Sequence, residues 1–272
     1  MILTDTHTHL YAEEFDSDRD LLISEAMARG VQRYFLPNID STSVNVLLSL
    51  QKKYPENCFA MMGLHPCSVK ENREEEMEKV ESLLKSESKF VAIGEIGIDL
   101  YWDKTFVKEQ EEVFRRQIRL ARQLDLPVVI HSRESFEEIY SILLEENQNS
   151  NSVTGNSKPE TVNRKPVRGI FHCFTGTLDQ AQRAIALGFY LGIGGVVTFK
   201  NSGLDKVVAE IPLEHLVLET DAPYLAPVPF RGKRNQPDYI LKVAEKIAGI
   251  KNCSLQQVAD VTTQNSKSIF GV

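Results

Sequence analysis

A regular alternation between short apolar segments and amphipathic segments constrains this chain most. Besides the N-terminal stretch 3–9, the segments with the length and composition of buried strands are 31–36, 58–64, 90–98, 127–131, 168–174, 190–193 and 216–220. Helical periodicity separates them, at 21–29, 44–53, 77–84, 106–124, 136–144, 178–187 and 204–210. The alternation predicts eight strand–helix repeats.

Strands that alternate with helices form right-handed βαβ units and a parallel sheet. Composition alone, with 42% hydrophobic residues, allows one large barrel or two smaller domains. Eight repeats favour the barrel, because a (β/α)8 TIM barrel usually needs about 250 residues. We therefore expect a single α/β domain over residues 1–272 with two extra C-terminal helices, and we interpret the polar segment 147–165 as a flexible insertion on the face opposite the active site.

The N-terminal stretch places two histidines, His7 and His9, two positions apart. Residues i and i+2 share one face of a strand, whereas on a helix they would point in different directions, so the pair is expected on a strand. Two neutral imidazoles on one face form half of a transition-metal site. The pair alone is weak evidence, since threonine-rich strands also carry histidines with ordinary hydrogen bonds.

Metal-type residues also end most of the other predicted strands. In a barrel the active site gathers at the carboxyl ends of the strands. Those ends carry His7, His9, His65, Glu95, His131, His172 and Asp221. Any one of them has an ordinary structural interpretation, but together they predict a convergent metal site; of the histidines only His215 falls outside this pattern.

Four imidazoles and two carboxylates exceed what one open tetrahedral ion needs, so they suit two divalent ions. Glu95 is the natural bridge, because a carboxylate has two oxygens. Imidazole and carboxylate ligands leave the metal open among Mg²⁺, Mn²⁺ and Zn²⁺. The chain has no G-x-S-x-G motif and no Walker-type phosphate loop, which disfavours a serine hydrolase and a P-loop nucleotidase.

The chain resembles the TatD family of metal-dependent deoxyribonucleases, within the amidohydrolase-like group. The matching segments, in family order, are 5–9 (DTHTH), 63–66 (GLHP), 94–99 (GEIGID), 129–133 (VIHSR), 171–176 (FHCFTG) and 219–227 (ETDAPYLAP). The resemblance implies a TIM barrel that hydrolyses phosphodiester bonds in DNA. It also implies two divalent metal ions held by His7, His9, Glu95, His131, His172 and Asp221. One departure is Phe230, where many similar bacterial members have histidine.

We expect Glu95 and Asp221 to be catalytic, with Asp221 as ligand and proton acceptor while a metal-activated hydroxide attacks phosphorus. The residues expected to contact substrate are His65, Arg133, Trp102 and Arg231. Each has a structural alternative: a hydrogen bond or ion pair for His65 and Arg133, a plug of the barrel for Trp102, and a solvated loop for Arg231.

The net charge of −7 argues against a broad cationic surface that coats duplex nucleic acid. An acidic protein suits a strand end threaded into a pocket better than a coated duplex. Exonuclease action on single-stranded or frayed DNA ends is what the family resemblance implies. Alternatives are a metallohydrolase of small amides, esters or phosphate esters, and a metal-stabilised binding protein without turnover. Four scattered cysteines and the absence of an apolar run or leader favour a cytoplasmic protein, and no obligate protein partner or membrane contact is expected.

Overall fold

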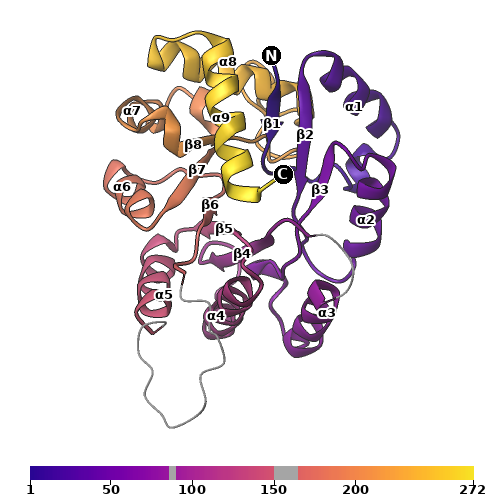
Figure 1. Cartoon of the computed structure of the whole chain (residues 1–272), viewed down its shortest axis with the longest axis vertical. Coiled ribbons are helices and arrows are strands. Elements are labelled where there is room, and N and C mark those ends of the chain that lie inside the picture. Colours follow the sequence, from indigo (N-terminus) through magenta and orange to yellow (C-terminus); the bar gives the residue numbers. More distant parts are fainter. Residues whose placement is uncertain (86–89, 150–164) are drawn as a thin grey trace.

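The computed structural model describes residues 1–85, 90–149 and 165–272, in which short strands stand in a ring surrounded by helices (Figure 1). The strands are β1 (Leu3–Asp5), β2 (Val31–Leu36), β3 (Cys58–Ala60), β4 (Ile93–Asp99), β5 (Val128–Arg133), β6 (Gly169–Phe171), β7 (Phe189–Ile193) and β8 (Leu216–Leu218). The α-helices are α1 (Arg19–Ala28), α2 (Val44–Lys53), α3 (Arg73–Lys85), α4 (Val107–Leu124), α5 (Phe136–Asn149), α6 (Leu178–Ala186), α7 (Leu204–Glu210), α8 (Ile240–Lys251) and α9 (Leu255–Phe270).

The ring consists of two parallel sheets, one of β1 to β3 and one of β4 to β8. Backbone hydrogen bonds join the sheets at both junctions. Beyond β1, the N–H of Thr6 donates to Leu218 of β8 over 3.0 Å, and beyond β3 the N–H of Met62 donates to Ala92 over 3.2 Å. The predicted α/β barrel is therefore confirmed.

The predicted strand for the His-x-His pair is wrong, because β1 ends at Asp5. The next residues bond to two different neighbours, since Thr6 donates to β8 and Thr8 donates to the carbonyl of Phe35 in β2. The chain thus leaves the regular register before it reaches His7. The strand predicted at 58–64 likewise ends early, at Ala60.

Part of the expected polar insertion at 147–165 is helical, because α5 continues to Asn149. The remainder of that prediction, residues 150–164, lies outside the described residues. Within the described ranges, none of the helices combines the length and the apolar character that crossing a membrane requires.

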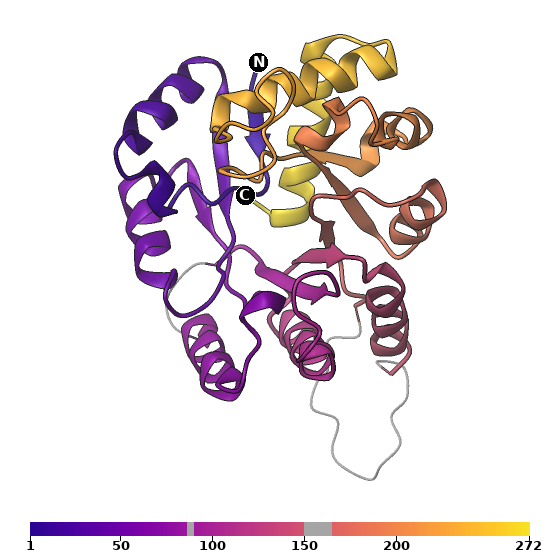
Figure 2. The same cartoon turned by 180° about the vertical axis from the view of Figure 1, so that it is seen from behind.

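The two C-terminal helices occupy different places. Helix α8 packs beside α7, as the partner helix of β8, whereas α9 packs against β1 and β8 and lies across the ring (Figure 1; Figure 2 gives the opposite view). Phe270 of α9 stacks on Phe35 of β2 with ring centroids 4.0 Å apart. An apolar layer inside the ring joins them, consisting of Met61, Ala92, Val129, Ile170, Val217 and Ile269.

One buried carboxylate strengthens the β1–β8 junction. Asp5 is fully buried and accepts hydrogen bonds from the N–H and the hydroxyl of Thr220, over 2.9 Å and 2.6 Å. Burial raises the pKa of Asp5 to about 8, although the bonds from Thr220 lower it. The carboxyl group therefore fixes the chain between β8 and Asp221.

We expect Asp5→Ala to lower the free energy of unfolding by about 2–5 kcal/mol, because two buried donors of Thr220 lose their acceptor. The exposed Asp260→Ala serves as the control, with an effect within about 0.5 kcal/mol. Urea unfolding followed by circular dichroism measures both variants. An Asp5→Ala variant as stable as the control would contradict the role of Asp5.

Candidate metal centre

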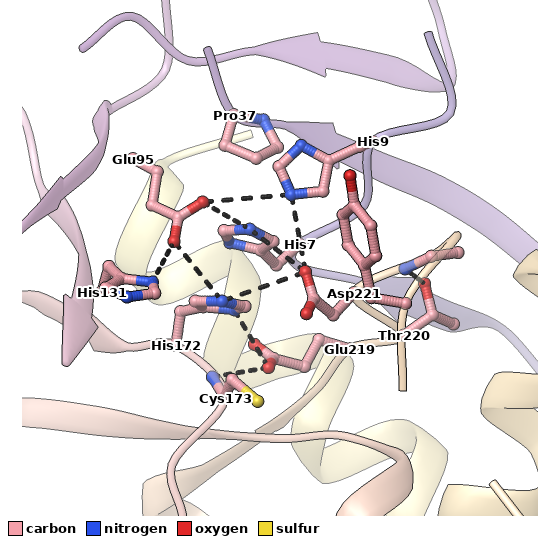
Figure 3. A network of polar contacts seen from close by, with 12 residues as sticks. His7, His9, Pro37, Glu95, His131, His172, Cys173, Glu219, Thr220 and Asp221 are labelled. Atoms are coloured by element: carbon pink, nitrogen blue, oxygen red, sulfur yellow. Dashed lines mark hydrogen bonds and ion pairs between the residues drawn. The ribbon is translucent and has the colours of Figure 1, made fainter. Parts of the chain in front are cut away.

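Side chains from five strands, or from the residues that follow them, meet at one rim of the barrel, where the carboxyl ends of parallel strands gather. Two follow β1, one each lies in β4 and β5, one follows β6, and one lies beyond β8. Figure 3 shows this cluster around a single carboxylate; its members are His7, His9, Glu95, His131, His172 and Asp221.

The carboxylate of Glu95 lies at the centre and is only 2% exposed. Its Oε2 is 3.1 Å from Nε2 of His7 and 3.9 Å from Nε2 of His9. Its Oε1 is 2.8 Å from Nδ1 of His131 and 3.6 Å from Nε2 of His172. Apart from His65, which also lies 3.3 Å from Oε1, the two oxygens thus face two different pairs of imidazoles, as a carboxylate between two cations requires.

Asp221 joins the same cluster from the opposite side. Its Oδ1 lies 3.4 Å from Nε2 of His9, 3.8 Å from Nε2 of His7 and 4.0 Å from Nε2 of His172. Asp221 and Cys173 have φ values of 56° and 45°, in the left-handed region. Such backbone strain is typical of functional sites.

The residues present fit divalent metal ions. Imidazole nitrogens and carboxylate oxygens are ligands of Zn²⁺ and Mn²⁺, and potential donor atoms in groups such as His7–His9–Glu95 lie within 4.8 Å of one another. His7 is fully buried. In the described part of the chain its Nδ1 has no hydrogen-bond partner, and its Nε2 has only the 3.1 Å ion-pair contact with Oε2 of Glu95. A buried nitrogen without a partner is costly, and a cation would supply one.

His9 and His131, two of the imidazoles placed to ligate a metal, each contact a polar group on the side of the ring away from Glu95. The hydroxyl of Tyr11 lies 3.0 Å from Nδ1 of His9 and donates to the carbonyl of Pro37. Asp99 Oδ2 lies 2.9 Å from Nε2 of His131. Partners of this kind fix the ring and its tautomer. Sequence reasoning missed both; Asp99 carried a signal, since it is four residues after Glu95 at the end of the same strand.

Glu219 plays the corresponding part for His172. Its Oε1 lies 3.1 Å from Nδ1 of His172 and accepts the N–H of Cys173. A Cβ at position 192 would lie 2.1 Å from Oε2 of Glu219, so Gly192 leaves the space that this carboxylate fills. The same residues form a further possible metal-binding group, His172–Cys173–Glu219.

His65 is oriented as a hydrogen-bond donor. Its Nδ1 accepts the N–H of Cys67 over 3.1 Å, so in the neutral ring the hydrogen is on Nε2. That Nε2 lies 3.3 Å from Oε1 of Glu95. A nitrogen that carries hydrogen cannot ligate a metal, and His65 therefore suits an anion or the bridging carboxylate.

The charges of the cluster stabilise one another. Burial opposes charge on His172, but Glu219, Glu95 and Asp221 outweigh it and raise the pKa of the ring to about 10. Burial also opposes ionisation of Glu95, yet the surrounding imidazoles, His65 first among them, hold the pKa of its carboxyl group well below the usual range. In the absence of metal, His172 therefore carries a proton at neutral pH.

Trp102 and Arg133, expected to contact substrate, lie together on the rim. The guanidinium of Arg133 lies 4.1 Å from the ring centroid of Tyr101 and 5.1 Å from that of Trp102. Trp102 is 67% exposed, and Tyr101 is 49% exposed, so neither ring plugs the barrel.

The basic run 231–234 divides into two parts. Arg231 is exposed and stacks on Phe199, with 4.6 Å between guanidinium carbon and ring centroid. Arg234 instead pairs with Asp18 over 2.5 Å and is held in the structure. Phe230, at the position of the family histidine, stacks on Tyr239 with centroids 3.9 Å apart.

Comparisons with known proteins agree on one family. A family model described as TatD related DNase matches residues 4–271. The chain is 40% identical to the uncharacterized metal-dependent hydrolase YabD of Bacillus subtilis, over the whole of both chains. It is 34% identical to YcfH of Escherichia coli K12, covering 100% of this chain and 97% of that protein. The solved structure of YjjV, a TatD homologue from Escherichia coli, aligns with TM-score 0.87 and 28% identity over 99% and 98% of the two chains.

We expect metal binding to release protons and to strengthen as pH rises from 6 towards the pKa of about 10 that His172 has without metal. A cation must displace the proton on His172, so each proton released makes the apparent affinity rise about tenfold per pH unit. Calorimetric titration of Zn²⁺ in buffers of different ionisation enthalpy counts these protons. An affinity that does not change between pH 6 and 8 would contradict the assigned charge state.

Proposed function

Because the chain belongs to the TatD family of metal-dependent hydrolases, we propose that it hydrolyses phosphodiester bonds in DNA, as an exonuclease on single-stranded ends. One observation carries the proposal: leaving aside His65, whose ring donates a hydrogen bond, the two oxygens of Glu95 face two separate pairs of imidazoles. That arrangement suits two adjacent divalent ions, which are a recurrent solution for displacement at phosphorus.

We assign two ions, each Mg²⁺, Mn²⁺ or Zn²⁺, to the two sides of Glu95. His7, His9 and Asp221 would hold one, and His131 and His172 the other. When bound, such ions lower the pKa of a coordinated water and stabilise negative charge on phosphate oxygens.

The chain itself supplies proton and hydrogen-bond chemistry. Asp221 stays ionised because its pKa is lowered: burial opposes this, but the charges of His172, His9 and His7 outweigh burial. We assign Asp221 the proton of the attacking water. The Nε2–H of His65 points towards Oε1 of Glu95. A phosphate oxygen bound beside that carboxylate would accept a hydrogen bond from the same N–H.

A preference for single strands is supported by the rim. Exposed aromatic rings stack on unpaired bases, and Tyr101 and Trp102 are exposed beside Arg133. Arg231 is assigned a contact with the sugar–phosphate backbone. A net charge of −7 disfavours coating of a duplex. We infer a cytoplasmic location because all four cysteines are free thiols.

A second candidate is hydrolysis of a small amide, ester or phosphate ester. It is favoured by a pocket of about 380 Å³ beside His172, between the segments that follow β5 and β6. Glu134 and Glu138 lie in its wall together with Phe136 and Phe174. An acidic, aromatic pocket admits a small, uncharged group more readily than a polyanion.

The deciding experiment gives chelator-stripped protein three substrates, namely end-labelled single-stranded DNA, p-nitrophenyl phosphate esters and simple amides. Mg²⁺, Mn²⁺ or Zn²⁺ is then added back separately. We expect metal-dependent release of label from DNA. Cleavage of an amide without loss of labelled DNA would overturn the nuclease assignment in favour of the second candidate.

We expect Glu95→Ala to reduce DNA hydrolysis by at least about 10³-fold, because removal of the bridge leaves two cations close together without their shared anion. Circular dichroism and thermal unfolding of the variant establish that it is folded. The variant, purified in parallel, also controls for contaminating nuclease. Near-normal hydrolysis by folded Glu95→Ala protein would refute the bridging role.

We expect Trp102→Ala to raise KM for single-stranded DNA about 5-fold to 100-fold, because one stacked base contributes about 1–3 kcal/mol. Trp102→Phe keeps an aromatic face and should lose less. A dialkyl phosphate ester has no ring to stack, so its KM should change little in either variant. Equal losses on both substrates would show that Trp102 acts on the centre rather than on bases.

A further inference from the structure

Asp99 connects the metal centre to the aromatic rim. It is the last residue of β4 and is only 1% exposed. Its Oδ2 lies 2.9 Å from Nε2 of His131. Its Oδ1 accepts the backbone N–H groups of Tyr101 and Trp102, over 2.8 Å and 2.9 Å. One side chain thus contacts both a ligand-type imidazole and the loop that carries the exposed rings.

The contact with His131 determines which ring nitrogen faces the centre. A carboxylate accepts and never donates when ionised, so it keeps a hydrogen on Nε2 of His131. The other nitrogen, Nδ1, lies 2.8 Å from Oε1 of Glu95. With Nε2–H fixed, the lone pair of Nδ1 is the one available to a cation beside Glu95.

The contacts on the other oxygen hold the aromatic loop against β5. The N–H of Leu100 donates to the carbonyl of Arg133 over 2.9 Å, and Asp99 pairs with Arg133 in the strand register. The rings of Tyr101 and Trp102 are perpendicular, with centroids 5.0 Å apart, and Arg133 lies over both. Asp99 therefore determines where this stack stands relative to the centre.

We propose that Asp99 is a positioning residue with two separable tasks: it presents Nδ1 of His131 to a divalent cation, and it anchors the Tyr101–Trp102–Arg133 stack beside that cation. The first task rests on the metal centre assigned under the proposed function. In this way the distance from the cation to the stacking surface is set by one carboxylate rather than by a flexible loop.

The test uses two measurements that need no turnover and no DNA. Zn²⁺ affinity is measured by competition with a chromophoric chelator. The anchoring of the stack is measured by fluorescence anisotropy and acrylamide quenching of Trp102, the single tryptophan of the chain. A protein that binds Zn²⁺ but leaves DNA intact would refute the nuclease and leave this inference standing.

Asp99→Asn separates the tasks, because an amide has one acceptor and one donor side. If its oxygen stays with the two N–H groups, its nitrogen donates to Nε2 of His131 and moves the ring hydrogen to Nδ1. Zn²⁺ affinity then falls about 10-fold to 100-fold while Trp102 keeps its wild-type signals. If the amide instead rotates so that its nitrogen faces the two N–H groups, Zn²⁺ affinity is kept and Trp102 becomes mobile. Loss of either property supports the proposal.

Asp99→Ala should lose both properties. The matched control is Glu219→Gln, which faces His172 and does not contact the loop, so it should weaken Zn²⁺ binding and leave Trp102 unchanged. Circular dichroism verifies that each variant is folded. If Asp99→Ala does not fold, the results for Asp99→Asn alone decide the test. Wild-type Zn²⁺ affinity together with wild-type Trp102 anisotropy in Asp99→Asn would overturn the proposal.

Discussion

The ionised carboxylate of Glu95, buried inside the barrel rim, is the interaction on which the other features depend. Burial of such a charge costs several kcal/mol unless opposite charge and hydrogen bonds surround it. The imidazoles that surround it come from chain positions as distant as His7 and His172. A closed ring of parallel strands brings those positions to one rim. The ionised form of buried Glu95 is therefore stable only when the barrel is closed.

The two ends of the ring divide the physical tasks. The rim holds charge, together with left-handed backbone at Asp221 and Cys173, which costs on the order of 1–3 kcal/mol for each residue. The opposite end holds the apolar layer where Phe270 of α9 stacks on Phe35. Burial of apolar surface stabilises the fold without directional bonds. The rim can therefore keep a polar geometry that is unfavourable alone.

Sequence reasoning was most accurate where periodicity decides, as in Val31–Leu36 and Val44–Lys53, whose bounds match the prediction. It failed where the chain bonds to two neighbours at once, as it does just before His7. The ligand-type residues could be named because their positions follow from strand ends. Their outer partners, Tyr11 and Asp99, were not named, because a hydrogen bond between two side chains depends on how each one is oriented at the rim, and neither strand nor helix periodicity predicts that orientation.

Those outer partners make the two sides of Glu95 unequal. On one side, His9 is oriented by the neutral hydroxyl of Tyr11. On the other side, His131 and His172 contact the carboxylates of Asp99 and Glu219. A carboxylate makes the imidazole that it contacts a stronger base than a hydroxyl does. Two cations bound at Glu95 would therefore experience different electrostatic fields, with the greater negative charge behind His131 and His172. The rate of metal exchange should therefore differ between the two positions.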